Sequence, residues 1–165
     1  KTAAKSLDIS PAAFDLTDGS HIVYQEDANE LIKRISGDIL YLDPPYNARQ
    51  YGSNYHMLNT IAAYEEFEPR GKTGLPEYNR SDYCSKRTVT ESFDQLISDA
   101  QFEYVFLSYN NEGLMTHEQI TEIMNQYGKV ELRTTAYSRF KADKTENRNH
   151  TASAVEEYLF CLRKI

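Results

Sequence analysis

The sequence predicts an α/β fold with a mostly parallel sheet that ends in an antiparallel pair of strands. Two short apolar runs, Ile39–Leu42 and Tyr104–Leu107, have the length and continuity typical of parallel strands that are buried on both faces. Segments with helical periodicity lie beside both runs, which is the order from which parallel sheets are built. Two final strand candidates, Lys129–Thr135 and Glu157–Leu162, are joined by a polar basic loop without room for a crossover helix, so we expect them to pair antiparallel.

The first elements of the chain predict a strand, helix and strand unit. Residues 1–20 lack a clear period and are interpreted as a leader or linker, and His21–Gln25 is a short strand candidate. Asp27, followed three residues later by Glu30, matches the capping box that opens a helix, which we expect over Ala28–Ile35. With the strand at 39–42, this order indicates a βαβ unit.

Three further helices are expected from apolar residues at helical spacing. One covers Tyr55–Tyr64 and should bury the apolar side chains Met57, Leu58, Ile61 and Ala62. A second includes Phe93, Leu96, Ile97 and Ala100, and a third starts at the capping box of Thr116 and Gln119. Between the first two, residues 65–90 have no period, and a polar loop of this length inside a domain is usually functional or mobile.

Composition restricts the class of protein. A chain of 165 residues with 40% hydrophobic and 26% charged residues suits one folded domain, and it disfavours both intrinsic disorder and a membrane protein. Its two cysteines are too few for a disulfide scaffold or a CxxC metal site, so we expect no metal. With no bilayer-length apolar run and no signal-peptide pattern, we expect a reducing, cytoplasmic setting and no membrane.

The charge of the chain is unevenly distributed. The net charge is −7, yet residues 70–87 and residues 133–148 each carry five Lys or Arg against two acidic residues, a local charge of +3. Phosphate contacts are local and are screened beyond about 8 Å, so an acidic body with two basic loops can still bind a polyanion. On charge alone, ordinary solvated loops remain the simpler interpretation.

The run Asp43-Pro-Pro-Tyr46 is the most informative motif, because it follows the apolar run at 39–42 directly. Each proline fixes its own φ, lacks an N–H group and pushes the preceding residue towards extended geometry. The motif therefore forms a stiff edge that presents Asp43 and Tyr46 with little freedom and leaves carbonyl groups free to accept hydrogen bonds. Ligands bind beyond the carboxyl ends of the strands in open parallel sheets, which is where this edge is expected.

Asp-Pro-Pro-Tyr after an apolar strand resembles the catalytic signature of the D12-class adenine-N6 DNA methyltransferases. The likeness extends through the surrounding residues, from Asp43-Pro-Pro-Tyr-Asn-Ala-Arg-Gln-Tyr51 through Asn54-Tyr-His56 to Ser108-Tyr-Asn110, and is similar to the branch found in type IIS restriction–modification systems. It runs from about residue 21 to the end of the chain. The resemblance implies a Rossmann-like core, S-adenosyl-L-methionine as methyl donor, and double-stranded DNA with a flipped adenine as partner.

The same resemblance implies roles for individual residues. The Asp43 side chain and the Pro44 carbonyl would accept hydrogen bonds from the adenine amino group, and Tyr46 would stack on the extruded base. Asp27, Ala28 and Asp43 would contact the cofactor, although a helix N-cap explains Asp27 equally well. Residues expected to contact DNA are Arg49, Tyr51, Arg80, Lys86, Arg87, Asn110 and Lys141; for Asn110, a plain turn after a strand is the alternative.

The sequence departs from the family pattern in one respect. The glycine-rich cofactor loop Phe-x-Gly-x-Gly, which precedes this stretch in the family, does not occur here. We therefore interpret residues 21–165 as the C-terminal part of a catalytic domain, with a missing N-terminal half or a restriction subunit as a possible partner. Two alternatives stay open: methylation of another amino group (cytosine N4, RNA or a protein amide), and an inactive fragment that binds DNA or a partner chain.

Overall fold

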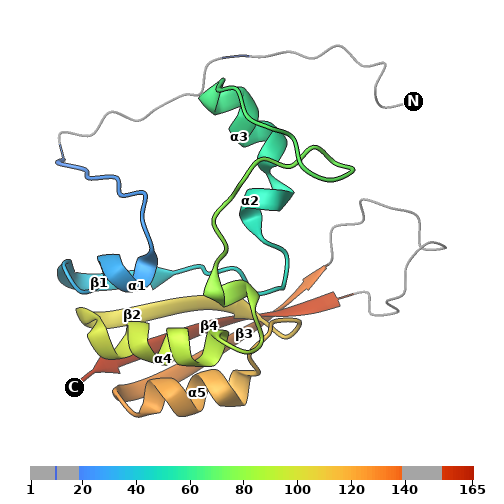
Figure 1. The fold of residues 1–165 in the computed structure, drawn as a ribbon. Helices are drawn as coiled ribbons and strands as arrows, with labels where there is room; N and C mark the ends of the chain where they lie inside the picture. The colour runs from blue at the N-terminus through green and yellow to red at the C-terminus, as the bar shows by residue number, and fades with distance from the viewer. Residues whose placement is uncertain (1–9, 11–18, 139–153) are drawn as a thin grey trace.

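A computed structural model describes residue 10, residues 19–138 and residues 154–165, and shows a four-stranded mixed sheet (Figure 1). The strands are β1 (Ser36–Leu42), β2 (Gln101–Asn110), β3 (Gly128–Ser138) and β4 (Ala154–Lys164), in the order β1-β2-β4-β3. β1 and β2 are parallel, whereas β2–β4 and β3–β4 are antiparallel. The expected antiparallel pair is confirmed. The expectation of a mostly parallel sheet is wrong among the described strands, because β4 inserts between β2 and β3 in the opposite direction.

Helices α4 (Val89–Asp99) and α5 (His117–Asn125) cover one face of this sheet (Figure 1). α4 lies in the crossover between the parallel strands β1 and β2. Alternate β2 residues Val105, Leu107 and Tyr109 are at most 1% exposed, because they point into the core beneath the two helices. α5 starts at the predicted capping box, in which the Thr116 hydroxyl accepts the Gln119 amide N–H and the Gln119 side chain accepts the Thr116 N–H.

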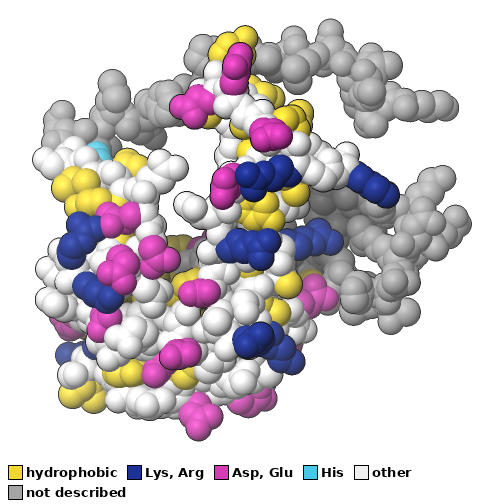
Figure 2. All heavy atoms as spheres, viewed as in Figure 1, with side chains coloured by type: hydrophobic (Ala, Val, Ile, Leu, Met, Phe, Trp, Pro, Cys, Tyr) yellow, Lys and Arg dark blue, Asp and Glu magenta, His cyan; other side chains and the backbone are white. Residues whose placement is uncertain are grey.

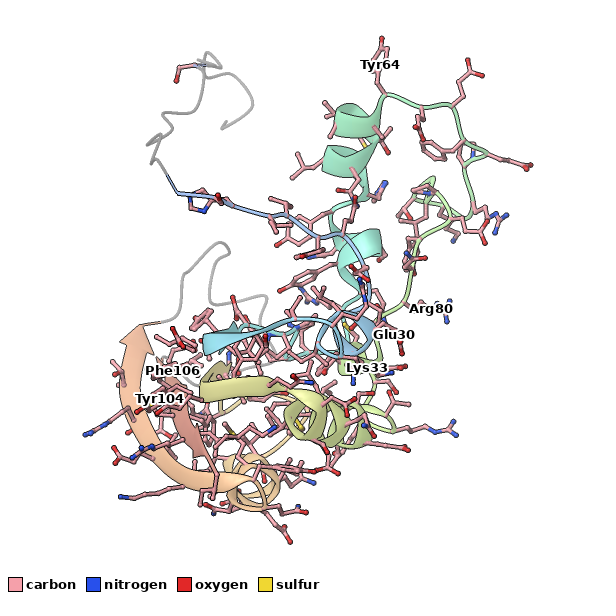
Figure 3. The ribbon with its side chains drawn as sticks, turned by 90° about the vertical axis from the view of Figure 1, so that its left-hand side faces the viewer. Glu30, Lys33, Tyr64, Arg80, Tyr104 and Phe106 are labelled. Atoms are coloured by element: carbon pink, nitrogen blue, oxygen red, sulfur yellow. The ribbon has the colours of Figure 1, made fainter. Side chains whose placement is uncertain are left out.

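The opposite face of the sheet carries apolar side chains that no described helix covers. Ile39 and Tyr41 of β1 are 62% and 61% exposed, and Tyr104 of β2 is 37% exposed. Figure 3 shows Tyr104 and Phe106 on the side of the sheet away from α4. The expectation that both apolar runs are buried on both faces is therefore wrong for the described residues. Both runs nevertheless consist of consecutive apolar residues, so the sheet has a second face that is suited to packing.

The elements before β1 differ from the prediction. Residues 21–25 are not paired with any described strand, so the predicted first strand, and with it the βαβ unit, is wrong. The helix α1 (Ala28–Leu31) has a single turn and ends well before Ile35, because a turn leads directly into β1. Asp27 is the N-cap, as expected, but the Glu30 carboxylate pairs with Lys33 at 2.7 Å.

The segment after the Asp-Pro-Pro-Tyr motif forms two short helices, α2 (Tyr51–Asn54) and α3 (His56–Ala63), that rise away from the sheet (Figure 1). The predicted helix at 55–64 is thus present, but its apolar side chains are not buried. Met57, Leu58 and Ile61 are each more than 60% exposed, and Ala62 is exposed as well. α3 ends at Ala63, and the left-handed backbone of its C-cap Tyr64 (φ 50°) terminates the helix. Tyr64 marks the far tip of α3 in Figure 3.

The polar stretch at 65–90 returns from α3 to the sheet largely as a loop. It contains one isolated bridge between Arg70 and Leu75 and the 3-10 turn η2 (Asp82–Cys84) before α4 begins at Val89. The expectation of a long loop is therefore correct for most of this range.

Candidate active site

A cavity of about 710 Å³ lies at the carboxyl end of β1. Its lining comes from three separate segments: residues 25–28 before and at the start of α1, residues 41–45 at the end of β1, and residues 79–81 with Tyr83, Phe93 and Leu96. The volume falls within the range of about 300–1,000 Å³ that is usual for ligand pockets. The surface is visibly hollowed between the segment leading to α1 and the loop before α4 (Figure 2). The cavity is thus where an open sheet is expected to bind its ligand.

Two of the predicted site residues, Asp27 and Asp43, line this cavity and differ in their hydrogen bonding. One oxygen of the Asp27 carboxylate accepts the backbone N–H groups of Asn29 at 2.9 Å and Glu30 at 3.3 Å, which fixes its orientation. The Asp43 carboxylate has no hydrogen-bond or ion-pair partner among the described residues, and none of them donates to the Pro44 carbonyl. Asp43 and Pro44 therefore offer unused acceptors at the cavity, while Asp27 is a helix N-cap with its second oxygen available.

The apolar floor of the cavity was not predicted from the sequence. Tyr83, Phe93 and Leu96 are 9%, 1% and 3% exposed. The Tyr83 hydroxyl donates to the Asn29 side-chain oxygen at 2.9 Å, and the Asn29 amide donates to the Ser92 carbonyl at 2.8 Å, so the floor is tied to α1 and α4. Burial raises the pKa of Tyr83 and keeps the phenol neutral. The periodicity of Phe93 and Leu96 indicated a core stripe, and nothing local showed that the stripe also faces a ligand pocket.

One wall of the cavity is attached to the segment that follows the Asp-Pro-Pro-Tyr motif. The Gln50 side chain accepts the Ser81 backbone N–H at 2.8 Å and donates to the Ser81 carbonyl at 3.2 Å. The Cys84 thiol lies 3.4 Å from the Arg49 carbonyl, to which it donates. Arg80 is the one basic residue among those that line the cavity.

Tyr46 lies beside the cavity rather than in its lining, and its ring is 36% exposed. Its backbone carbonyl accepts the Leu114 N–H at 2.9 Å, and its ring meets Tyr109 edge-on with centroids 6.3 Å apart. The neighbouring Tyr51 opens α2, and burial together with the nearby Tyr46 and the Asp43 charge raises its pKa. Aromatic rings thus gather next to the free Asp43 carboxylate.

The residues expected to contact DNA are placed differently from one another. Arg49, Lys86 and Arg87 are exposed, with the last two just before α4. Figure 2 shows Lys and Arg side chains following one another from the segment beside α3 down to the surface over α4. Asn110, in contrast, is 4% exposed, and its side-chain oxygen accepts the Glu112 N–H at 3.1 Å, so its amide faces the protein. Lys141 lies outside the described residues.

The chain matches a family model over residues 1–123: the D12 class N6 adenine-specific DNA methyltransferases. The chain belongs to this family. It is 62% identical over 164 residues to the Type II methyltransferase M.NlaIII of Neisseria lactamica, a match that covers 99% of this chain and 49% of the relative. It is 44% identical over 143 residues to the Type II methyltransferase M.FokI of Planomicrobium okeanokoites, covering 86% of this chain and 22% of that protein.

A third family member, the modification methylase StsI of Streptococcus sanguinis, is 34% identical over 146 residues, which is 86% of this chain and 22% of the relative. The chain thus spans about half the length of M.NlaIII and less than a quarter of M.FokI and StsI. No solved structure matches the chain significantly.

The residues around the cavity fit the cofactor that the family implies. S-adenosylmethionine carries a positive sulfonium and a positive ammonium group beside one carboxylate. The lining holds three carboxylates, Glu26, Asp27 and Asp43, against one arginine. Glu26 is already paired with Arg34, so Asp27 and Asp43 are the two carboxylates that can face the positive groups. The adenine ring of the cofactor is apolar on both faces, which suits the floor of Tyr83, Phe93 and Leu96.

Among the described residues, no group of three or more His, Cys, Asp or Glu is arranged to hold a metal ion. In that same part of the chain, no helix is long and apolar enough to cross a membrane.

Proposed function

We propose that this protein transfers a methyl group from S-adenosylmethionine to the N6 amino group of adenine in double-stranded DNA, as the modification arm of a restriction–modification system. The observation that carries the proposal is the pair of free acceptors, the Asp43 carboxylate and the Pro44 carbonyl, at the edge of a ligand-sized cavity. Family membership and relatives named Type II methyltransferases and modification methylases support the same activity.

The chemistry requires the adenine amino group to become a nucleophile. Its lone pair is delocalised into the ring, so the group is a poor nucleophile until that pair is localised. Asp43 and the Pro44 carbonyl accept the two N6 hydrogens, which favours a tetrahedral nitrogen and stabilises the positive charge that develops on it. The bound cofactor supplies an electrophilic methyl group. As the N6–methyl bond forms, the sulfur–methyl bond of the cofactor would break and its electron pair would stay on sulfur. The N6 nitrogen would then lose one proton, which we assign to the free Asp43 carboxylate.

Base extrusion explains the position of Tyr46. A base inside the duplex cannot reach the cavity, and an extruded base is held by stacking on an aromatic face. The exposed ring of Tyr46, directly after the acceptors, is the surface that we assign to this role. We assign the phosphate contacts to Arg49, Arg80, Lys86 and Arg87, with Tyr51 beside them. We leave Asn110 out of this set, because its side chain is buried and already hydrogen-bonded.

We further propose that residues 21–165 are the C-terminal part of a longer catalytic domain, with residues 1–20 as the connection to it. The uncovered apolar face of β1 and β2 supports this, as does the length of the relatives. A missing N-terminal half would add the glycine-rich cofactor loop and cover that face. The intact mass of the protein at its natural length should then be far above 19.0 kDa. A mass near 19.0 kDa would contradict the proposal.

The activity is tested with the protein at its natural length, labelled S-adenosylmethionine and duplex DNA. We expect label in DNA, recovered as N6-methyladenine after digestion to nucleosides, and confined to one short sequence context. A duplex in which adenine is replaced by 7-deazaadenine should still be methylated, because the N6 group is unchanged. Label recovered in cytosine, in RNA or in protein would instead identify one of the competing substrates, and no transfer at all would contradict the proposed function.

A further inference from the structure

Tyr109 of β2 contacts the ring that we assign to base stacking. It is 1% exposed, so its side chain is fixed in the interior. The edge-to-face arrangement of Tyr46 and Tyr109, with an interplanar angle of 79°, is a favourable geometry for two aromatic rings. Tyr46 itself is partly exposed, and a partly exposed ring without such a neighbour is free to adopt other rotamers.

The turn after β2 wraps around the Tyr109 phenol. The Met115 backbone N–H donates to the Tyr109 hydroxyl at 3.3 Å. Gly113 lies against the ring so closely that a Cβ atom there would be 2.1 Å from the Tyr109 Cε1 atom. Between these two residues, the Leu114 N–H donates to the Tyr46 carbonyl at 2.9 Å. Tyr109 therefore contacts Tyr46 in two ways, directly through its ring and indirectly through the turn that holds the Tyr46 backbone.

The same turn is anchored to the sheet. Asn111 donates its N–H to the Glu156 carbonyl of β4 at 3.1 Å, and its side-chain oxygen accepts the Glu156 N–H at 3.2 Å. The turn cannot easily move away from Tyr46 while these bonds hold. With the backbone of Tyr46 held in this way, the Tyr109 ring is the described aromatic ring that meets its side chain edge-on.

We propose that Tyr109 is a positioning residue that holds the Tyr46 ring in the orientation that stacks on the extruded adenine. The inference rests on the proposed function, because it assigns a support to a residue of that site. It predicts that loss of the Tyr109 ring weakens capture of the flipped base and lowers kcat, while binding of S-adenosylmethionine in the separate cavity is unaffected.

The test uses the protein at its natural length and two duplexes. One has adenine at the target position and gives kcat, and the other has 2-aminopurine there, whose fluorescence rises when the base leaves the stack. In Tyr109→Leu we expect most of that rise to be lost and kcat to fall about tenfold, with the cofactor Kd within twofold of the unsubstituted protein. Tyr109→Phe keeps the ring and removes only the acceptor for the Met115 N–H, so it should keep most of the fluorescence rise and lose about threefold in kcat.

Phe160→Leu is the matched control, because Phe160 is a fully buried aromatic of β4 whose described ring contact is with Tyr158 rather than with Tyr46. It should lower stability without changing the 2-aminopurine signal. A folded Tyr109→Leu protein with unchanged fluorescence signal and kcat would overturn this inference but not the proposed function. An equal loss of the fluorescence signal in Phe160→Leu would have the same consequence. If Tyr109→Leu does not fold, complete loss of the signal in Tyr109→Phe would overturn it. Absence of methyl transfer by the unsubstituted protein would instead overturn the proposed function and this role with it.

Discussion

At the scale of single residues, the site depends on side chains that hold its walls as well as on those that face the ligand. Gln50 is the clearest case, because its amide makes two hydrogen bonds with the Ser81 backbone and so joins the segment after Tyr46 to the cavity wall. We expect Gln50→Ala to raise the Kd for S-adenosylmethionine by up to about thirtyfold, since two bonds that order the wall, each worth roughly 1 kcal/mol, are lost. Isothermal titration calorimetry measures this Kd.

Gln95→Ala is the matched control for this prediction. Gln95 donates to Asp99 on the exposed side of α4, and this bond at 3.0 Å lies away from the cavity. The control should leave the cofactor Kd unchanged. Equal affinity of Gln50→Ala and the unsubstituted protein would show that the wall is held by other contacts.

At the scale of elements, β1 is the strand whose surroundings matter most. It pairs only with β2 among the described strands, so every second N–H of β1 points away from a partner. If a further strand of the natural-length protein lies beside it, all amides of Ile39–Leu42 should be strongly protected from hydrogen exchange. Fast exchange at alternate residues of β1 would show that it is a free edge.

Elements were predictable from the sequence where their signals are local. The capping box of Thr116 and Gln119 involves neighbours in the chain, and it forms as expected. The α3 residues Met57, Leu58 and Ile61 illustrate the opposite case. Their spacing correctly indicates an apolar helix face, but periodicity does not say what covers that face. For the same reason, the run at 39–42 indicated apolar surroundings that the described residues do not provide.

At the scale of the whole molecule, an acidic protein is proposed to bind an acidic polymer, so the placement of the basic residues decides the outcome. Lys86 and Arg87 are exposed in the segment between η2 and α4. Replacing both with Gln should weaken DNA binding at low salt. It should also reduce the slope of log K against log salt by about 1.8, since each phosphate contact contributes roughly 0.9. Fluorescence anisotropy over a salt series measures the slope.

A second pair of basic residues controls for net charge. Lys129 and Arg163 are exposed register partners on β3 and β4. Replacing both with Gln changes the net charge by the same amount and should leave the slope nearly unchanged. Equal effects of the two pairs would indicate that DNA responds to total charge rather than to the loop before α4.

The site as a whole was only partly predictable. Asp43, Pro44 and Asp27 were identified from a motif and a capping pattern, and the structure brings them to one cavity. The contacts of Tyr46 with Tyr109 and of Gln50 with Ser81 join residues 63 and 31 positions apart, and no local pattern encodes such pairs. The buried position of Asn110 also depends on the turn that closes over it, which a strand-end pattern does not reveal.

The most direct test of the account is the rate of methyl transfer by Asp43→Ala, compared with Asp38→Ala, which removes an exposed carboxylate from β1, the strand that precedes Asp43. Without the Asp43 acceptor, the adenine amino group loses half of its proposed activation. We expect transfer to fall about 10²–10³-fold, while DNA binding stays nearly intact and Asp38→Ala keeps full activity. Methyl transfer by Asp43→Ala at a rate close to that of the unsubstituted protein would contradict the central claim.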